Sequence, residues 1–130
     1  MNIEDAYFAG LVDGDGCIHI SNRGELSVTV TNCYRPVLDD LCSYYGGAVY
    51  KDRARQNSQE VYRWKLYCQK ADAILKRLLP YLRIKRNQAQ IALQHQDTKG
   101  YRKPIPANVL RERKRLTRQL RALNGGGLNK

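Results

Sequence analysis

The sequence predicts an α+β domain with one four-stranded, mainly antiparallel sheet. Two pairs of segments alternate apolar and polar residues with the period of two that is typical of half-buried strands. Segments with apolar residues at helical spacing precede, separate and follow these pairs. No low-complexity linker and no second copy of any motif occurs, so a single domain over residues 1–130 is expected.

Local signals place the elements in order. Asn2 can cap the first helix, and Arg23-Gly24 predicts a tight turn between the first two strands. Pro36 suits the first turn of a second helix, and Pro80 ends a third. We therefore expect a helix over about 2–14, strands over 17–22 and 25–31, a helix over 36–45, strands over 48–53 and 60–67, and helices over 71–79, 86–96 and 108–123.

The two faces of the expected sheet differ in chemistry. Ile18, Val28 and Trp64 are among the side chains that would lie under the helices, whereas the other face collects bases and short hydrogen-bonding groups. Such a ribbon can lie in a DNA major groove and read base edges, and an ordinary solvent-exposed face is the alternative. The residues expected on this polar face are His19, Ser21, Ser27, Thr29, Thr31, Lys51, Arg53, Arg63, Lys65 and Tyr67.

The charge of the chain points to a polyanionic partner. The formal net charge is +11, which alone does not separate DNA from RNA, a ribosome or a membrane surface. Residues 1–20 contain no Lys or Arg but do contain Glu4, Asp5, Asp13 and Asp15. An acidic segment on a basic body is typical of a metal or catalytic site set in a phosphate-binding surface, with chance as the alternative.

Several classes of protein are disfavoured. The N-terminus has no basic segment followed by a long apolar run, so no signal peptide is expected. No stretch approaches the roughly 20 apolar residues of a membrane span. The four cysteines contain no C-x-x-C pair, which favours reduced thiols over a zinc site. We therefore expect an intracellular protein, in the cytoplasm or an organelle, with no membrane partner.

Residues 8–16 carry the motif, and they read Phe-Ala-Gly-Leu-Val-Asp-Gly-Asp-Gly. Ala6, Gly10 and Gly14 recur at every fourth position, so they share one helix face on which a second copy of the helix could pack closely. Asp13 and Asp15 would lie at the helix C-terminus, where the dipole disfavours negative charge and a bound cation would relieve it. The alternative is a simple helix cap, with Gly16 left-handed and Asp15 solvated.

This motif closely resembles that of the LAGLIDADG homing endonucleases, and the chain has about the length of a single-motif member. The resemblance implies a helix–strand–strand–helix–strand–strand–helix domain whose curved sheet contacts double-stranded DNA. It also implies a homodimer whose motif helices meet through Ala6, Gly10, Asp13 and Gly14. Magnesium would then be held by Asp15 and the backbone of Gly14.

Further residues are assigned by the same resemblance. Lys85 matches the position of an active-site lysine, and Asn32 stands where single-motif members often have a glutamine. Arg23, Arg35 and Arg55 join the residues of the polar sheet face as expected DNA contacts. The implied activity is site-specific, metal-dependent cleavage of both DNA strands at a long pseudo-palindromic site.

Other functions remain open on this scaffold. The basic helix over 108–123 could extend a surface for RNA, as in a maturase, contact DNA phosphates, or simply be solvated. A non-cleaving, sequence-specific DNA-binding protein, such as a transcriptional regulator, is the other alternative. Neither the target sequence nor the setting of the gene, for which a mobile intron is one possibility, follows from the sequence.

Overall fold

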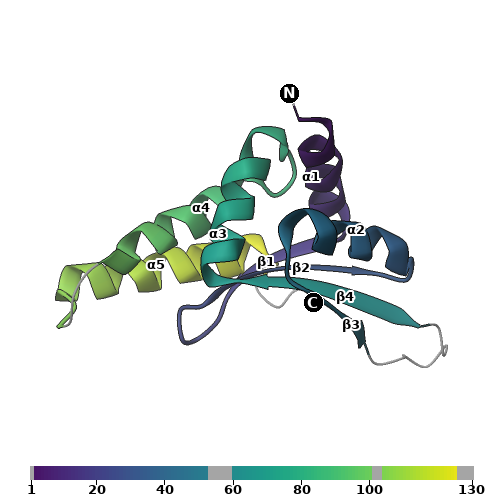
Figure 1. Cartoon of the computed structure of the whole chain (residues 1–130). Coiled ribbons are helices and arrows are strands. Elements are labelled where there is room, and N and C mark those ends of the chain that lie inside the picture. The colour runs from purple at the N-terminus through teal and green to yellow at the C-terminus, as the bar shows by residue number, and fades with distance from the viewer. Residues whose placement is uncertain (1, 53–59, 101–103, 126–130) are drawn as a thin grey trace.

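The expected α+β architecture is confirmed. The computed structural model describes residues 2–52, 60–100 and 104–125. The four strands form one antiparallel sheet in the order β1-β2-β4-β3, and the helices of the described residues gather on one side of it (Figure 1). The elements are α1 (Ile3–Asp15), β1 (Gly16–Ile20), β2 (Leu26–Asn32), α2 (Arg35–Tyr45), β3 (Ala48–Asp52), β4 (Val61–Tyr67), α3 (Cys68–Leu78), η1 (Leu79–Tyr81), α4 (Arg86–Asp97), η2 (Thr98–Gly100) and α5 (Ala107–Leu123).

Helix α1 begins and ends as its sequence predicts, with one correction. The Asn2 side chain accepts a hydrogen bond from the Asp5 amide at 3.0 Å, which caps the helix. At the other end Gly16 is extended, with φ −95° and ψ 169°, so the alternative of a left-handed glycine cap is wrong. A Cβ at Gly16 would lie 2.7 Å from the Val12 carbonyl oxygen, so glycine allows the helix to lead directly into β1.

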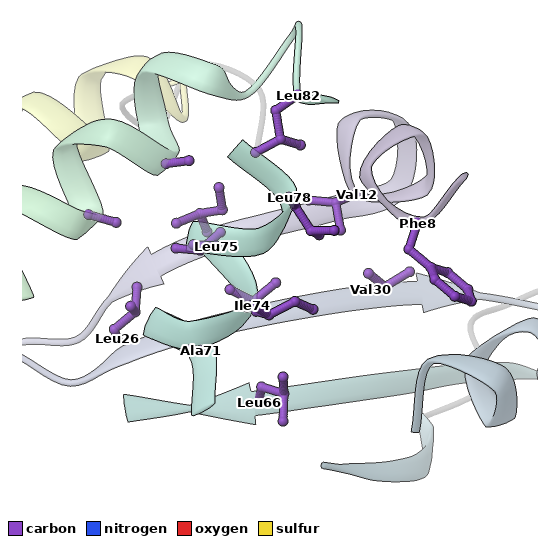
Figure 2. Close-up of a cluster of buried hydrophobic side chains, with 14 of the residues drawn as sticks. Phe8, Val12, Leu26, Val30, Leu66, Ala71, Ile74, Leu75, Leu78 and Leu82 are labelled. Carbon is purple, nitrogen blue, oxygen red and sulfur yellow. The ribbon is translucent and has the colours of Figure 1, made fainter. Parts of the chain in front are cut away.

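An apolar layer holds α1 and α3 on the sheet. Figure 2 shows side chains from both helices meeting those of β2 and β4. Truncating one such buried side chain to Ala typically costs about 2–5 kcal/mol, so this layer fixes where the end of α1 lies. The fully or almost fully buried residues that it draws together include Phe8, Val12, Leu26, Val30, Leu66, Ile74, Leu75, Leu78 and Leu82.

A buried carboxylate ties three helices together. Asp5 of α1 is only 5% exposed. It accepts a hydrogen bond from the Tyr45 hydroxyl of α2 at 2.6 Å and forms an ion pair with Arg77 of α3 at 3.0 Å. Burial and the hydrogen bond to Asp5 raise the pKa of Tyr45 above its ordinary value. The charge of Asp5 is thus satisfied inside the chain, so this acid serves the fold.

The last two long helices extend the domain beyond one edge of the sheet. Helix α5 packs against α4, and both approach edge strand β1 (Figure 1). The Asn124 side chain donates to the Ile18 carbonyl at 2.9 Å, which joins the end of α5 to β1. The hairpin between β1 and β2 is closed by Ser21, whose hydroxyl accepts from the Arg23 and Glu25 amides at 3.2 and 3.1 Å. These turn bonds end β1 at Ile20, two residues earlier than expected.

Candidate functional site

Three elements bring Asp15, Asn32 and Lys85 to one end of the sheet. Asp15 ends α1, Asn32 ends β2, and Lys85 directly precedes α4. The Asn32 amide donates to Asp15 Oδ2 at 2.9 Å, while Asn32 Oδ1 accepts from the Tyr34 amide at 2.7 Å. The Asn32 side chain is therefore held from both sides, and it orients the exposed carboxylate of Asp15.

Asp13 joins the end of α1 to the start of α4. Its Oδ2 accepts from the Arg83 amide at 2.9 Å and its Oδ1 from the Lys85 amide at 3.0 Å. The Lys85 ammonium returns a bond to the Asp13 carbonyl at 3.1 Å. A carboxylate at a helix N-terminus and a cation at a helix C-terminus both suit the helix dipoles. Asp13, expected at a dimer interface, is thus engaged within its own chain and places Lys85 beside the end of α1.

The two acids of the motif differ in what they leave free. Both Asp13 oxygens have backbone donors, whereas Asp15 Oδ1 has no hydrogen-bond partner among the described residues. Gly14 is exposed beside it. Within the described part of the chain, no group of three or more His, Cys, Asp or Glu side chains is arranged to hold a metal ion. At this end of α1, one chain therefore offers the free oxygen of Asp15 and nearby backbone carbonyls.

The polar face of the sheet starts at this cluster. Strand pairing places Cys17 opposite Thr29, and Thr29 opposite Lys65, so these side chains share the face away from the helices. The Lys65 ammonium lies 5.3 Å from the centre of the Tyr67 ring. Burial, followed by the charges of Arg121 and Lys65, lowers the pKa of His19 from its ordinary value. This face also holds the expected residues Thr31 and Arg63.

Two residues expected on this face, Lys51 and Ser21, lie elsewhere, and a third, Ser27, is on it but buried. Lys51 pairs with Tyr62, next to the pair of Val49 with the buried Trp64, so it lies on the helix side and its expected place was wrong by one residue. Ser27 points to the polar face but is only 6% exposed, because its cross-strand neighbours His19 and Tyr67 stand beside it.

Ser21 lies past the end of β1, where its hydroxyl accepts the hydrogen bonds of the turn.

Two other expected DNA contacts, Arg23 and Arg35, lie outside the strands. Arg23 is exposed at the tip of the β1–β2 hairpin. Arg35 opens α2, where its guanidinium pairs with Asp39 at 3.5 Å and lies 5.4 Å from the Tyr62 ring centre.

Arg53 and Arg55 lie outside the described residues.

Acidic residues on the β3–β4 hairpin were not anticipated. Asp52 pairs with Arg63 at 2.7 Å, and Glu60 pairs with Lys51 at 2.6 Å. A signal was present, since Asp52 stands between Lys51 and Arg53, and Glu60 stands three residues before Arg63. Asp52 holds Arg63 in one direction on the polar face.

The exposed side of α1 is apolar and open. Ile3 is 75% exposed and Tyr7 is 59% exposed. A Cβ added at Gly10 or Gly14 would meet nothing within 4 Å. These residues form a stripe that runs down the helix to Asp15, with Ala6 half-buried beside it. The expected packing face is thus uncovered in the single chain.

Comparison with known proteins was negative by sequence and positive by structure. No protein-family model matches the chain, and no curated protein matches it either. The homing endonuclease I-CvuI, solved in complex with DNA, is 26% identical; the match covers 98% of this chain and 86% of that chain, with a TM-score of 0.77. The archaeal intron-encoded homing endonuclease I-Vdi141I, also complexed with DNA, is 16% identical over 92% of this chain and 83% of its own, with a TM-score of 0.75.

A longer protein matches in part. The LAGLIDADG homing endonuclease I-LtrWI, bound to target DNA, is 16% identical over 91% of this chain but only 44% of its own, with a TM-score of 0.68. Among the described residues, no helix has the length and apolar character needed to cross a membrane. The motif over residues 8–16 resembles that of the LAGLIDADG homing endonucleases, and the chain shares the fold of these enzymes along almost its whole length.

Proposed function

We propose that this protein is a site-specific double-strand DNA endonuclease that acts as a homodimer with a divalent metal on a long, pseudo-palindromic site. One observation carries the proposal. Asp15, with one free oxygen, meets Asn32 and Lys85 at the end of a basic sheet face that the described helices leave open. The candidate catalytic groups and a surface that can contact DNA therefore lie in one domain.

The polar sheet face is the proposed DNA contact. Its Thr hydroxyls, its Arg and Lys side chains and the ring of Tyr67 are groups that can bond to or pack on base edges in the major groove. I-CvuI, I-Vdi141I and I-LtrWI were each solved with DNA, which supports the same partner here. Arg63, held by Asp52, is directed before DNA arrives, so less side-chain freedom is lost on binding.

The residues fit a magnesium site for which one chain supplies only some of the ligands. Asp15 would supply a carboxylate and Gly14 a backbone carbonyl, and phosphate oxygens with water would complete the set, as magnesium prefers. I-CvuI was solved with DNA in the presence of Mg or Ca, which supports a divalent ion. Bound there, the ion would offset the charge that develops on the phosphate during hydrolysis.

Asn32 and Lys85 have distinct proposed roles. Asn32 keeps the Asp15 carboxylate in one orientation through its 2.9 Å bond. Lys85 puts a positive charge at the C-terminal end of α1, close to where the scissile phosphate would lie. Such a fixed charge stabilises negative charge that grows in the transition state.

The homodimer is proposed from the exposed side of α1 and from the size of the longer proteins that share this fold. Packing two copies of the Gly10–Gly14 surface together would bury that apolar stripe and bring two Asp15 residues near each other. I-LtrWI and I-SmaMI match this chain over only 44% and 45% of their own lengths, so each is about twice as long. Two copies of the present chain would equal one such protein.

The test is cleavage of a randomised plasmid library, followed by sequencing of the cut ends. With magnesium, the wild type should cut both strands at related, near-palindromic sites. With calcium in place of magnesium, the same sites should be bound but not cut. Binding without cutting in magnesium would support a non-cleaving regulator instead, and selective binding of intron RNA over DNA would support a maturase.

A second measurement tests which surface reads sequence. Changing Lys65 to Gln and Thr31 to Ala together should alter the preferred base pairs among the cut sites. Changing Arg111 to Gln removes a cation from the outer side of α5 and should leave those preferences unchanged. An unaltered site profile in the sheet-face variant would contradict the assignment.

A further inference from the structure

A basic pocket lies at the other end of the β1–β2 hairpin from Asp15. It has a volume of about 420 Å³ and opens between the hairpin tip, the end of α4 and one side of α5. Six cationic side chains line it, and no described carboxylate does. The cations are Arg23, Lys99, Arg113, Lys114, Arg118 and Arg121.

The cations of this pocket are positioned by uncharged acceptors. On the β3–β4 hairpin, by contrast, Lys51 and Arg63 are paired with carboxylates. Neutral acceptors fix the direction of a cation without cancelling its charge. Four such bonds are made: Lys99 Nζ to the Gly24 carbonyl at 2.6 Å, Arg113 Nε and Nη2 to the Thr98 hydroxyl and carbonyl at 2.8 and 2.7 Å, and Arg121 Nη2 to Asn22 Oδ1 at 2.6 Å.

The remaining three cations are available to a ligand. Within the described residues, the side chains of Arg23, Lys114 and Arg118 have no hydrogen-bond or ion-pair partner. Lys114 and Arg118 are four positions apart on α5, so they lie on the same side of the helix as Arg121. Arg111 and Arg115 lie outside the pocket, and Arg115 is paired with Glu112 at 2.6 Å. The uncompensated charge of α5 is therefore concentrated on its pocket side.

The lowered pKa values of two histidines indicate a positive potential that extends from the pocket to the polar sheet face. Burial, then the charges of Lys99 and Arg113, lower the pKa of the pocket residue His95 to about 4. His19, on the polar sheet face, has its pKa lowered by burial and then by Arg121 and Lys65. Arg121 thus acts on both sides, because it lines the pocket and lies near His19.

We propose that this pocket binds a phosphate of the DNA backbone, at the flank of the base pairs that the β1–β2 hairpin contacts. The proposal rests on the proposed function only for its choice of DNA as the partner. A sheet in the major groove has phosphates along both of its edges, and β1 is the edge strand beside the pocket. The five residues of β1 place the phosphate roughly 17 Å outward from Asp15.

Such a contact would add affinity and fix the position of the subunit on DNA without reading sequence. The test compares two variants that each lose two charges from α5. Lys114→Gln/Arg118→Gln changes the pocket, and Arg111→Gln/Arg115→Gln is the matched control. Binding to a mixed-sequence duplex of about 40 base pairs is measured in calcium over a range of salt. The pocket variant should lose about tenfold in affinity and about two units of salt slope, and the control less than half of either.

Histidine NMR supplies a readout at the pocket itself, because the chain has only two histidines. The duplex should raise the pKa of both His95 and His19 in the wild type. In Lys114→Gln/Arg118→Gln, saturated with the duplex, the rise should be lost for His95 and kept for His19. Thermal unfolding of both variants checks that the surface substitutions leave the fold intact.

The outcomes separate this proposal from the proposed function. Equal losses in the two variants would overturn the pocket and leave the nuclease intact. Inorganic tripolyphosphate, tested in parallel, would overturn the DNA assignment if only its binding depended on Lys114 and Arg118. A wild type that binds duplex through the pocket but never cuts would overturn the proposed nuclease and support the pocket.

Discussion

The two ends of the β1–β2 hairpin differ in the sign of their charge and in how their charged side chains are held. At the α1 end, the Arg83 and Lys85 amides hold both oxygens of Asp13, and the Asn32 amide holds one oxygen of Asp15. At the tip, six cations surround a pocket, and the three that are held in place are held by neutral acceptors. The first arrangement fixes the place of one free carboxylate oxygen. The second keeps a large charge that depends little on the position of any one atom.

This difference predicts different responses to substitution. Changes at the acidic end should alter the rate of the reaction with little effect on DNA binding. Changes at the basic end should alter binding to every sequence and leave the chemical step alone.

The largest effect is expected from Asp15→Asn. The amide keeps an acceptor for Asn32 but loses the charge that would hold a divalent ion. Cleavage in single turnover should fall at least about 1,000-fold, while binding in calcium stays equal or becomes tighter. Asp40→Asn, an exposed acid of α2, is the control and should cut normally. Substantial cutting by Asp15→Asn would remove Asp15 from the proposed metal site.

Gly10→Leu should give the next largest effect. Gly10 is exposed and a Cβ added there meets nothing within 4 Å in the single chain, so the monomer should fold normally. Between two packed α1 helices it should weaken the dimer about 100-fold, with loss of double-strand cleavage. Sedimentation of both proteins measures this, and Ala122→Leu on the exposed side of α5 is the size-matched control. Unchanged association of Gly10→Leu would place the interface elsewhere.

Asp13→Asn should reduce cleavage about tenfold through Lys85. An Asn can accept from only one of the two amides that Asp13 now satisfies, which costs about 1–3 kcal/mol and frees the segment that carries Lys85. A double-mutant cycle with Lys85→Ala checks the route, because the two losses should overlap and not add. Asp5→Asn is the control for lost stability alone, since Asp5 serves the buried network with Arg77.

Fully additive losses would show that Asp13 acts independently of Lys85.

The sequence alone predicted the fold and the end of α1, but not the contacts made by distant segments. Period-two alternation predicts strands, and residues 8–16 predict where a helix ends in a carboxylate. The phase of β3 was wrong at Lys51 because pairing with β4, and not local pattern, sets it.

The basic pocket was missed for a related reason. The Arg121–Asn22 contact joins residues 99 positions apart, and the spacing of cations on α5 does not reveal which element faces them. Except in β3, the predicted faces of the strands agree with the structure, whereas the neighbours of those faces required the packed structure.

The smallest effect at neutral pH concerns His95. Its pKa is about 4 in the folded protein and 6.5 ordinarily, so the unfolded chain takes up a proton first as the pH falls. Stability from this residue is complete above pH 6.5 and is lost progressively as the pH falls toward 4. The free energy of unfolding should be lower by about 1 kcal/mol at pH 6 than at pH 8, measured by urea denaturation.

In His95→Gln that decline should shrink clearly, while His19→Gln, whose exposed ring has a smaller role in the fold, should retain most of it. An equal decline in wild type and His95→Gln would show that His95 is not held neutral by the pocket. Saturating duplex DNA should also flatten the decline in the wild type, because phosphate near Lys99 and Arg113 relieves the positive potential at His95.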